Sequence, residues 1–328
     1  MTDTTASRLG QINASGSTDA IFLKKFGGEV VSSFDRHTVM DPLGMKRTIQ
    51  NGKSAQFPST GRATTAYHSA GENILDPTNS LLSTINANER VVTVDSKLLA
   101  ATFVDEVDEL KNHYDIRSEY ASQLGEALAW ENDLRLMRIG VLGARDTTAR
   151  ITGSGVAGEA ITDADFETNG SSAVDTIYTI AQKFDEKHVP KSDRFVIVTP
   201  QAYWTLVKQT DLVNTDISGS GNGNFAQGIV KEAGGIKIIA SNAMLALRDL
   251  GSSGVFTADA GEGDDTSGTY TNTVALAMQK EGLASVILKG MKMEMQYKVE
   301  YQGTLMVASF VQGHNYLRNE CLIEIKTA

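Results

Sequence analysis

The segment from residue 41 to residue 95 constrains the fold more than any other part of the chain. Its helix-breaking residues include three of the chain's five prolines: Pro42, Pro58, Pro77, Gly44, Gly52, Gly61 and Gly71. No long helix fits there. The candidate strands at 45–54 and 90–99 lie roughly 35 residues apart, and compact domains rarely contain so long an irregular connection without a use for it.

The same segment carries large apolar side chains that a solvated loop would expose. They are Phe57, Tyr67, Ile74, Leu75, Leu81, Leu82 and Ile85. Monomeric proteins rarely leave so many such side chains in water. We therefore interpret the segment as a long hairpin-like arm whose apolar residues find their partners on another copy of the chain.

The overall composition is that of a folded protein without a membrane span. The chain has 328 residues, of which 41% are hydrophobic and 21% charged, so wholesale disorder is excluded and one to three cores are available. No apolar run approaches the roughly 20 residues that a bilayer requires, and from the polar residues 1–19 we expect no secretory signal. The single cysteine, Cys321, excludes an internal disulfide and fits a reducing cytoplasm.

Charge is spread unevenly along the chain. Residues 1–95 hold nine basic and nine acidic residues, so the formal charge of −10 comes from residues 96–328, with 21 basic and 31 acidic residues. This part is expected to repel nucleic acid. Clusters of Lys and Arg with interleaved aromatics are missing, which argues against a protein that reads DNA or RNA sequence.

Helical patterns occur at the N-terminus and after the hairpin-like segment. Residues 1–18 predict an arm, and 19–34 predict an amphipathic helix whose apolar stripe includes Phe22 and Phe26. The longest helix is expected at 103–140, with an acidic start and a basic end that complement the helix dipole. At 1.5 Å per residue it would be roughly 57 Å long.

The rest of the chain mixes helices and strands, so the fold class is α+β. The expected helices and strands are Val174–His188, Arg194–Val198, Gln201–Gln209 after a Thr199-Pro200 cap, Ile236–Ala240, Thr273–Met278, Leu305–Val311 and Cys321–Ile325. Residues 291–302 alternate perfectly between apolar and polar, which predicts a long antiparallel strand with one buried face.

Catalytic and metal motifs are weak or incomplete. A G-x-G-x-x-G string at Gly153–Gly158 precedes Asp175, but a nucleotide site needs it to leave a strand and open a helix, and a polar stretch follows instead. The sequence Asp163–Glu167 begins like a calcium loop, yet Thr168 stands where glycine is required. The five histidines are isolated. We therefore expect no catalytic, cofactor-binding or metal-binding residues, and no enzyme.

Four stretches resemble a known family. IFLKKFGGEV at 21–30, NGKSAQFPSTGRATTAY at 51–67, LKNHYDIRSEYASQLGEALA at 110–129 and FVQGHNYLRNECLIEI at 310–325 are similar, in order and spacing, to the major capsid proteins of T-seven-like short-tailed phages. The middle of the chain, about 145–290, matches in layout alone. One departure is Asn319, where the family has a proline in its final turn, which makes the bond there less rigid.

The resemblance implies the HK97-type capsid fold and its four parts. These are an N-terminal arm at 1–40, an extended β-hairpin loop at 41–97, a peripheral domain at 98–150 and 289–328 with a long spine helix, and an axial domain at 151–288. The role of the acidic loop at 258–273 does not follow from the resemblance.

The resemblance also implies the function. Copies of the chain are expected to assemble as hexamers and pentamers into an icosahedral shell around double-stranded DNA, first as a procapsid on a scaffolding protein and then as an expanded capsid. The implied partners are the chain itself, scaffolding protein, portal and packaged DNA bound without sequence specificity, with a decoration protein as a further candidate. The implied location is the virion, assembled in the host cytoplasm.

Candidate residues for contacts between subunits come from the arm and the loop. They are Phe22, Phe26, Arg47, Lys53, Phe57, Arg62, Tyr67, Leu75, Leu81 and Leu82. Two alternatives stay open: an encapsulin-like nanocompartment shell, and a nucleotide-binding enzyme that uses Gly153–Gly158.

Overall fold

The computed structural model describes most of the chain after residue 37. The described residues are 38–61, 63–76, 81–83, 85, 87–107, 116–149, 156–209, 223–224, 229–250 and 270–327. The expected helix at 19–34 and almost all of the acidic loop at 258–273 lie outside them. The chain divides into two compact units. The first contains 1–37, 97–131 and 291–310, and the second contains 38–96, 132–290 and 311–328.

The helices and strands follow in chain order. The strands are β1 (Met45–Thr48), β2 (Ser54–Thr60), β3 (Ala87–Thr93), β4 (Leu98–Asp105), β5 (Glu159–Thr162), β6 (Arg194–Val198), β7 (Gly223–Asn224), β8 (Ile229–Val230), β9 (Glu232–Ala233), β10 (Ile236–Ala240), β11 (Thr273–Gln279), β12 (Leu283–Lys298), β13 (Gly303–Tyr316) and β14 (Leu322–Lys326). The α-helices are α3 (Ile116–Arg145), α4 (Gly170–Glu186), α5 (Pro200–Val207) and α8 (Asn242–Leu250). No helix within the described ranges is long and apolar enough to cross a membrane.

In the first unit, the start of α3 packs on a pair of antiparallel strands. Strand β4 pairs with β13 from Asp105 opposite Gly303 to Leu98 opposite Phe310. Leu124 and Leu128 of α3 lie in one apolar cluster with residues of both strands. Apolar side chains that recur with helical spacing on α3 therefore pack on side chains that point to one face of the two strands.

The expected helix at 103–140 begins too early. Residues 98–105 form β4, so Phe103 lies in a strand, and the α3 helix spans Ile116–Arg145. The burial of β4 alternates from residue to residue. Residues 103–105 pair with β13, which lies far away in the sequence, and this pairing outweighs the helical pattern of their own sequence.

The alternating stretch at 291–302 forms a strand as far as Lys298, and its described apolar side chains do not form the expected buried face within this chain. Strand β12 runs to Lys298 and a short 3-10 helix, Val299–Tyr301, follows. The side chains of Met291, Tyr297, Val299 and Tyr301 are all exposed.

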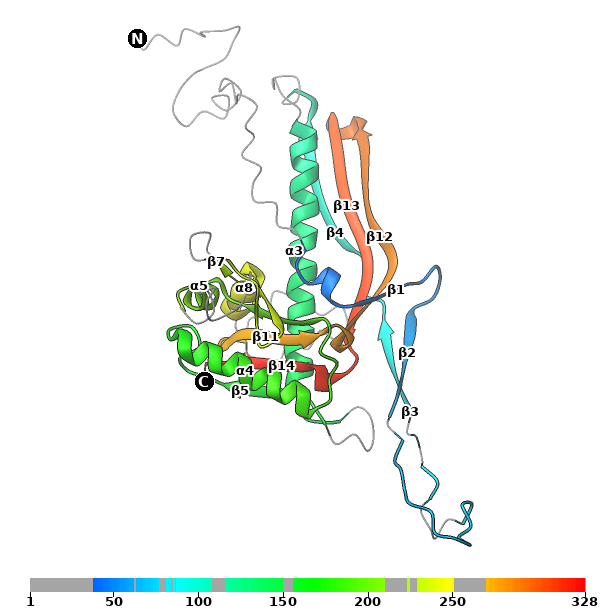
Figure 1. Cartoon of the computed structure of the whole chain (residues 1–328). Helices are drawn as coiled ribbons and strands as arrows, with labels where there is room; N and C mark the ends of the chain where they lie inside the picture. Colours follow the sequence, from blue (N-terminus) through cyan, green and yellow to red (C-terminus); the bar gives the residue numbers. More distant parts are fainter. Residues whose placement is uncertain are drawn as a thin grey trace, which may run out of the picture. The chain divides into compact units, whose positions relative to one another are not determined.

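The core of the second unit is a six-stranded sheet, with strand order β5-β14-β11-β6-β10-β9 (Figure 1). Strands β6 and β10 are parallel, and β11 pairs antiparallel with both β6 and β14. These four strands are mostly apolar, as expected for strands in the middle of a sheet. Helices α4 and α5 contribute Ile177, Ile180 and Leu206 to one core with these strands.

The cap predicted at Thr199-Pro200 is confirmed. The Thr199 side chain accepts a hydrogen bond from the backbone N–H of Ala202, and Pro200 occupies the first turn of α5. At the start of α4, Asn169 accepts in the same way from Ser171. Each side chain satisfies a backbone donor that has no partner within the helix.

The end of α3 packs against the opposite face of the six-stranded sheet. A Cβ at Gly140 would stand 2.5 Å from the Leu276 side chain of β11, and one at Gly143 would stand 2.6 Å from the Leu322 side chain of β14. These two glycines allow helix and sheet to approach closely. Ala275 and Ala277, which alternate with Leu276, belong to the core under α4 and α5.

Candidate functional site: the β2–β3 hairpin and its loop

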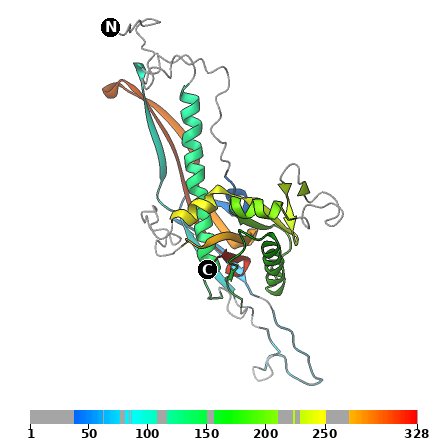
Figure 2. The same cartoon turned by 90° about the vertical axis from the view of Figure 1, so that its left-hand side faces the viewer.

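Strands β2 and β3 form a hairpin as expected, but the strand bounds expected at 45–54 and 90–99 are wrong. Residues 45–48 form β1, which pairs with β12, and the hairpin strands are Ser54–Thr60 and Ala87–Thr93, because the partner strand rather than the local pattern decides which residues pair. Strands β2 and β3 pair antiparallel from Ser54 opposite Thr93 to Thr60 opposite Ala87. Pro58 is tolerated because a two-stranded sheet has two edges, where a missing N–H faces outward. Within the second unit the hairpin extends away from the six-stranded sheet, as both views show (Figure 1 and Figure 2).

The base of the hairpin is buried in its own chain. Ala55, Phe57 and Val92 form an apolar cluster with Ala284 and Val286 of β12. Phe57 is only 8% exposed, and the Arg47 guanidinium lies over its ring, 4.7 Å from the centroid. The expectation that the Phe57 ring is exposed is therefore wrong, because this side chain anchors the hairpin to the core of its own chain.

Polar contacts fix the same base to β13. The Val94 N–H donates to the Lys53 carbonyl at 2.8 Å, and the Asp95 N–H donates to the Gln312 carbonyl at 3.2 Å. Arg90 donates to the Asn315 side chain at 3.1 Å, and its guanidinium lies 4.8 Å from the centroid of the Tyr316 ring. The hairpin is thus held by apolar and polar contacts at one end.

Beyond β2, local polar contacts shape the loop. The Thr64 N–H donates to Ser83 Oγ at 2.7 Å, which links the two sides. Near the tip, the Ser69 N–H donates to the Glu72 carboxylate at 3.0 Å, and Gly71 has a φ of 90° that glycine adopts without strain. The described loop is therefore ordered by turns and hydrogen bonds.

The loop exposes large apolar side chains, as the sequence indicated. Tyr67 is fully exposed and Leu75 is 74% exposed. Three further side chains, Ile74, Leu82 and Ile85, are more than half exposed. A surface of this kind, on a segment whose described contacts with the rest of the chain lie at its base, is typical of a site covered by a partner.

The candidate residues fall into three groups. Tyr67, Leu75 and Leu82 are exposed on the loop, Leu81 is half-buried, and Arg47 and Lys53 are exposed near the base. Phe57 is buried. Phe22, Phe26 and Arg62 lie outside the described residues.

Some residues that hold the hairpin carried no local signal in the sequence. Arg90, Gly313 and Asn315 act through contacts between parts of the chain that lie far apart. Ile74 and Ile85 were visible as apolar loop residues, and their exposure places them with Tyr67 and Leu75.

The nucleotide motif does not have the required context. Gly158 directly precedes strand β5, whereas the fingerprint needs its last glycine at the start of a helix. A Cβ at Gly158 would stand 2.4 Å from the carbonyl oxygens of Gly143 and Ala144. This glycine therefore serves close packing on the end of α3.

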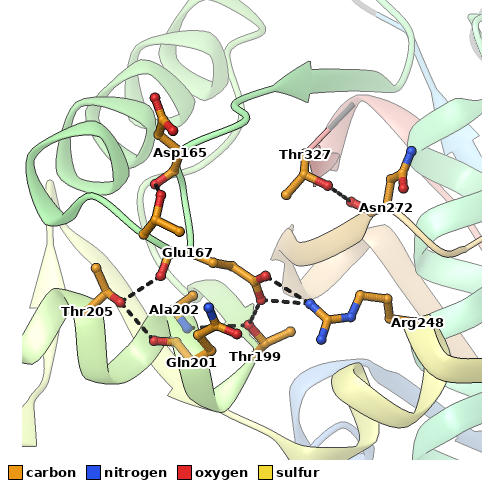
Figure 3. A network of polar contacts seen from close by, with 10 residues as sticks. Asp165, Glu167, Thr199, Gln201, Ala202, Thr205, Arg248, Asn272 and Thr327 are labelled. Carbon is orange, nitrogen blue, oxygen red and sulfur yellow. Dashed lines mark hydrogen bonds and ion pairs between the residues drawn. The ribbon is translucent and has the colours of Figure 1, made fainter.

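The calcium-like motif is used for internal structure. Asp163 accepts hydrogen bonds from Ser172 and Thr176 of α4. Figure 3 shows the Glu167 carboxylate between Thr199, at 2.5 Å, and Arg248, at 2.9 Å. Across the described ranges, no group of three acidic, His or Cys side chains is placed to hold a metal ion.

The single cysteine is buried. Cys321 ends a short 3-10 helix before β14, and burial raises the pKa of its thiol to about 12. A thiol in this state is a poor nucleophile.

Comparisons with known proteins agree with this architecture. Residues 56–326 match the family described as Gp10A-like, major capsid protein. The major capsid protein of Escherichia phage T7 is 30% identical over 332 aligned residues, which cover 94% of this chain and 92% of the phage protein. The capsid structure of cyanophage P-SCSP1u has 33% identity and a TM-score of 0.77, with 99% of each chain covered.

A more distant structure supports the fold alone. The mature capsid of bacteriophage PhiM1 has 19% identity and a TM-score of 0.70, over 98% of this chain and 97% of the other. These neighbours have the HK97-type fold, so the predicted α+β architecture of that type is confirmed.

Proposed function

Because the chain belongs to the Gp10A-like major capsid protein family and is therefore a tailed-phage capsid protein that assembles into a lattice, we propose that the loop at 61–85 joins neighbouring copies. The observation that carries this proposal is the exposure of Tyr67 and Leu75 on a hairpin whose base is buried. The nanocompartment alternative is not favoured, since the matched relatives are phage capsid proteins.

The energetics suit a contact that is weak alone and strong in a lattice. Full burial of one large apolar side chain contributes about 1.5–3 kcal/mol. Several such side chains give several kcal/mol, from which the cost of ordering and association is subtracted. A closed shell repeats the contact around every capsomer, so individual contacts stay reversible while the assembly is stable.

Basic residues near the hairpin base support charged contacts that orient one copy of the chain on its neighbour. Arg47 and Lys53 are exposed there, while the part of the chain after residue 95 carries the net negative charge. Rim charges of this kind steer encounter and orientation more than they add affinity.

A second apolar surface on the first unit supports a further contact between copies. Met291, Tyr297, Val299 and Tyr301 are exposed on β12 and the short helix after it. Phe103 packs edge-on against Tyr301, with ring centroids 6.2 Å apart. We propose that a neighbouring copy covers this surface, which explains the apolar alternation of the strand.

The finer features of the shell are also proposals. Hexamers and pentamers would close an icosahedral shell around double-stranded DNA, assembled in the host cytoplasm with scaffolding and portal proteins, and expand afterwards. We retain the division into arm (1–40), loop (41–97), peripheral domain (98–150 and 289–328) and axial domain (151–288). A net charge of −10 on each chain would keep the inner surface of the shell from binding DNA strongly, so that DNA can enter and leave. We further propose that the role of the chain is structural rather than enzymatic.

Polar substitution of two exposed loop residues tests the proposal. In the double variant Tyr67→Ser/Leu75→Ser the circular dichroism spectrum is expected to stay unchanged, because both side chains are largely exposed within the described part of the chain. The concentration at which shells appear is expected to rise at least tenfold, since each lost 1.4 kcal/mol per contact is a factor of ten. Electron microscopy and sedimentation measure the shells.

Ala66→Ser is the matched control, because Ala66 is exposed on the same loop and is small. This control is expected to assemble like the unmodified chain. Normal shells from the double variant at the unmodified concentration would remove the loop from the mechanism.

A further inference from the structure

The Asp133 side chain of α3 holds the chain at the first residues that the structure describes. Its Oδ2 accepts a hydrogen bond from the Val39 N–H at 2.6 Å, and its Oδ1 accepts one from the Met40 N–H at 3.2 Å. Asp133 is 4% exposed and Met40 is 1% exposed. One carboxylate therefore ties two consecutive backbone groups to a helix far away in the sequence.

Asp41 is the neighbouring charged group that acts on this carboxylate, and titratable groups on α3 and β13 contact other residues. Asp41 repels the Asp133 carboxylate, and the Oδ1 of Asp41 is buried without a hydrogen-bond partner while its other oxygen pairs with Lys46. On α3, Arg135 lies 3.9 Å from Asp95. On β13, His314 contacts Ser285 at 2.8 Å.

Burial dominates the ionisation of Asp133. It raises the pKa of this carboxyl to about 6 from an ordinary value of 3.8, with Asp41 adding to the shift and the backbone hydrogen bonds opposing it. Burial also lowers the pKa of His314 to about 4, so this imidazole stays neutral between pH 5 and pH 7.

We propose that Asp133 is a releasable latch that ties the Val39–Met40 segment to helix α3 and that opens more readily at neutral pH than in mild acid. This inference concerns contacts within one chain and does not depend on the proposed function.

The direction in which pH shifts the opening of the latch follows from proton binding in the closed and open states. With the latch closed, the carboxyl is buried and its pKa is about 6; with the latch open, the carboxyl faces water and its pKa returns towards 3.8. The closed state binds more protons between these values, so raising the pH favours the open state. Between pH 5 and pH 7 the opening equilibrium is expected to rise about tenfold.

Hydrogen exchange of the full chain, followed by mass spectrometry, measures the latch directly. In the peptide containing Val39 and Met40, exchange corrected for its intrinsic pH dependence is expected to rise about tenfold from pH 5 to pH 7. A peptide from the buried face of α4, at 177–184, serves as the internal reference and is expected to show no such rise.

Two variants separate Asp133 from its neighbours. Asp133→Asn cannot ionise, and its corrected exchange is expected to be independent of pH. Asp41→Asn removes the neighbouring charge, which lowers the midpoint of the rise but keeps the rise itself. An equal rise in the Asp133→Asn variant, or its loss in the Asp41→Asn variant, would overturn the proposal.

The unmodified chain decides the question if Asp133→Asn does not fold. A corrected exchange profile that is flat between pH 5 and pH 7 in the unmodified protein contradicts the latch, and a rise confined to the 38–44 region supports it.

Discussion

Gly313 of β13 lies against the last residue of β3 so closely that a Cβ at position 313 would stand 1.9 Å from the carbonyl oxygen of Thr93. Beside this contact, the Asp95 N–H donates to the carbonyl of Gln312. The base of the hairpin is therefore joined to β13 through backbone atoms, and only glycine permits the approach.

Gly313→Ala is expected to destabilise the subunit by roughly 3 kcal/mol or more, because the added methyl group meets backbone atoms that must move. Urea unfolding of the unassembled subunit measures the change. Gly290→Ala is the matched control, since a Cβ at Gly290 would have no neighbour within 4 Å, and it is expected to change stability by less than about 0.5 kcal/mol. Equal stability of the two variants would mean that the hairpin base adapts freely.

Phe57 separates stability from assembly. Phe57→Ala is expected to cost about 3–4 kcal/mol because it leaves a cavity in the cluster that Phe57 forms with Ala284 and Val286 and removes the ring under Arg47. Phe57→Leu keeps most of the volume and is expected to cost less than about 1.5 kcal/mol. The same unfolding measurement checks both, and an unchanged stability of Phe57→Ala would show that the ring does not anchor the hairpin.

The central strands of the six-stranded sheet could be predicted from the sequence to the residue. Arg194–Val198 and Ile236–Ala240 are mostly apolar and rich in β-branched residues, and the Thr199-Pro200 signal marks the helix after the first of them. These are local properties, and nothing elsewhere in the chain overrides them. The hairpin could also be predicted, because its prolines, glycines and apolar residues lie in one stretch.

What the sequence could not predict depends on contacts between distant parts of the chain. The helix expected from residue 103 was misplaced at its start, because residues 103–105 belong to β4, which pairs with the distant β13. Phe57 and Tyr67 are both aromatic residues of one segment, and only the position of β12 decides that the first is buried and the second exposed. Asn319 replaces the family's proline, yet its side chain donates to the Asp146 and Thr148 carbonyls at 2.9 and 2.7 Å, so hydrogen bonds fix the turn.

His314 is expected to make the subunit less stable in acid. Burial, and then the charge of Arg135, lower its pKa to about 4 from 6.5, so the unfolded chain binds more protons between these values and stability falls as the pH drops. Between pH 7 and pH 4.5 the loss from this group is about 2 kcal/mol. The contribution of neutral His314 to the stability of the folded subunit is fully present above pH 6.5 and is lost as the pH falls towards 4.

His314→Gln removes this titration, so the difference between its unfolding free energy and that of the unmodified subunit is expected to change by about 2 kcal/mol over the same range. Taking the difference cancels much of the opposite contribution of Asp133, which favours the folded state as the pH falls. His68→Gln, at an exposed loop position, is the control. A constant difference for His314→Gln would show that His314 is not buried in its neutral form.

The ion pair between Arg145 and the buried Glu324 allows two free energies to be measured separately. One is the cost of removing a single partner, and the other is the net contribution of the pair to stability. Nε and Nη2 of Arg145 donate to the two oxygens of Glu324, each at 2.6 Å, and Thr273 donates to one of these oxygens at 2.6 Å. Glu324 is fully buried. These contacts raise the pKa of Arg145, chiefly through the hydrogen bonds to Glu324, and they fasten the end of α3 to the sheet.

Arg145→Met leaves a buried carboxylate without its cation and is expected to cost about 3–5 kcal/mol. The double variant Arg145→Met/Glu324→Leu removes both charges and is expected to recover most of this loss, because a well-packed apolar pair often replaces a buried ion pair at little cost. Recovery stays incomplete by about 1 kcal/mol, since the Thr273 hydroxyl loses its acceptor. Urea unfolding of the three subunits gives the coupling energy, and a double variant as unstable as Arg145→Met would show that the pair itself stabilises the junction between α3 and β14.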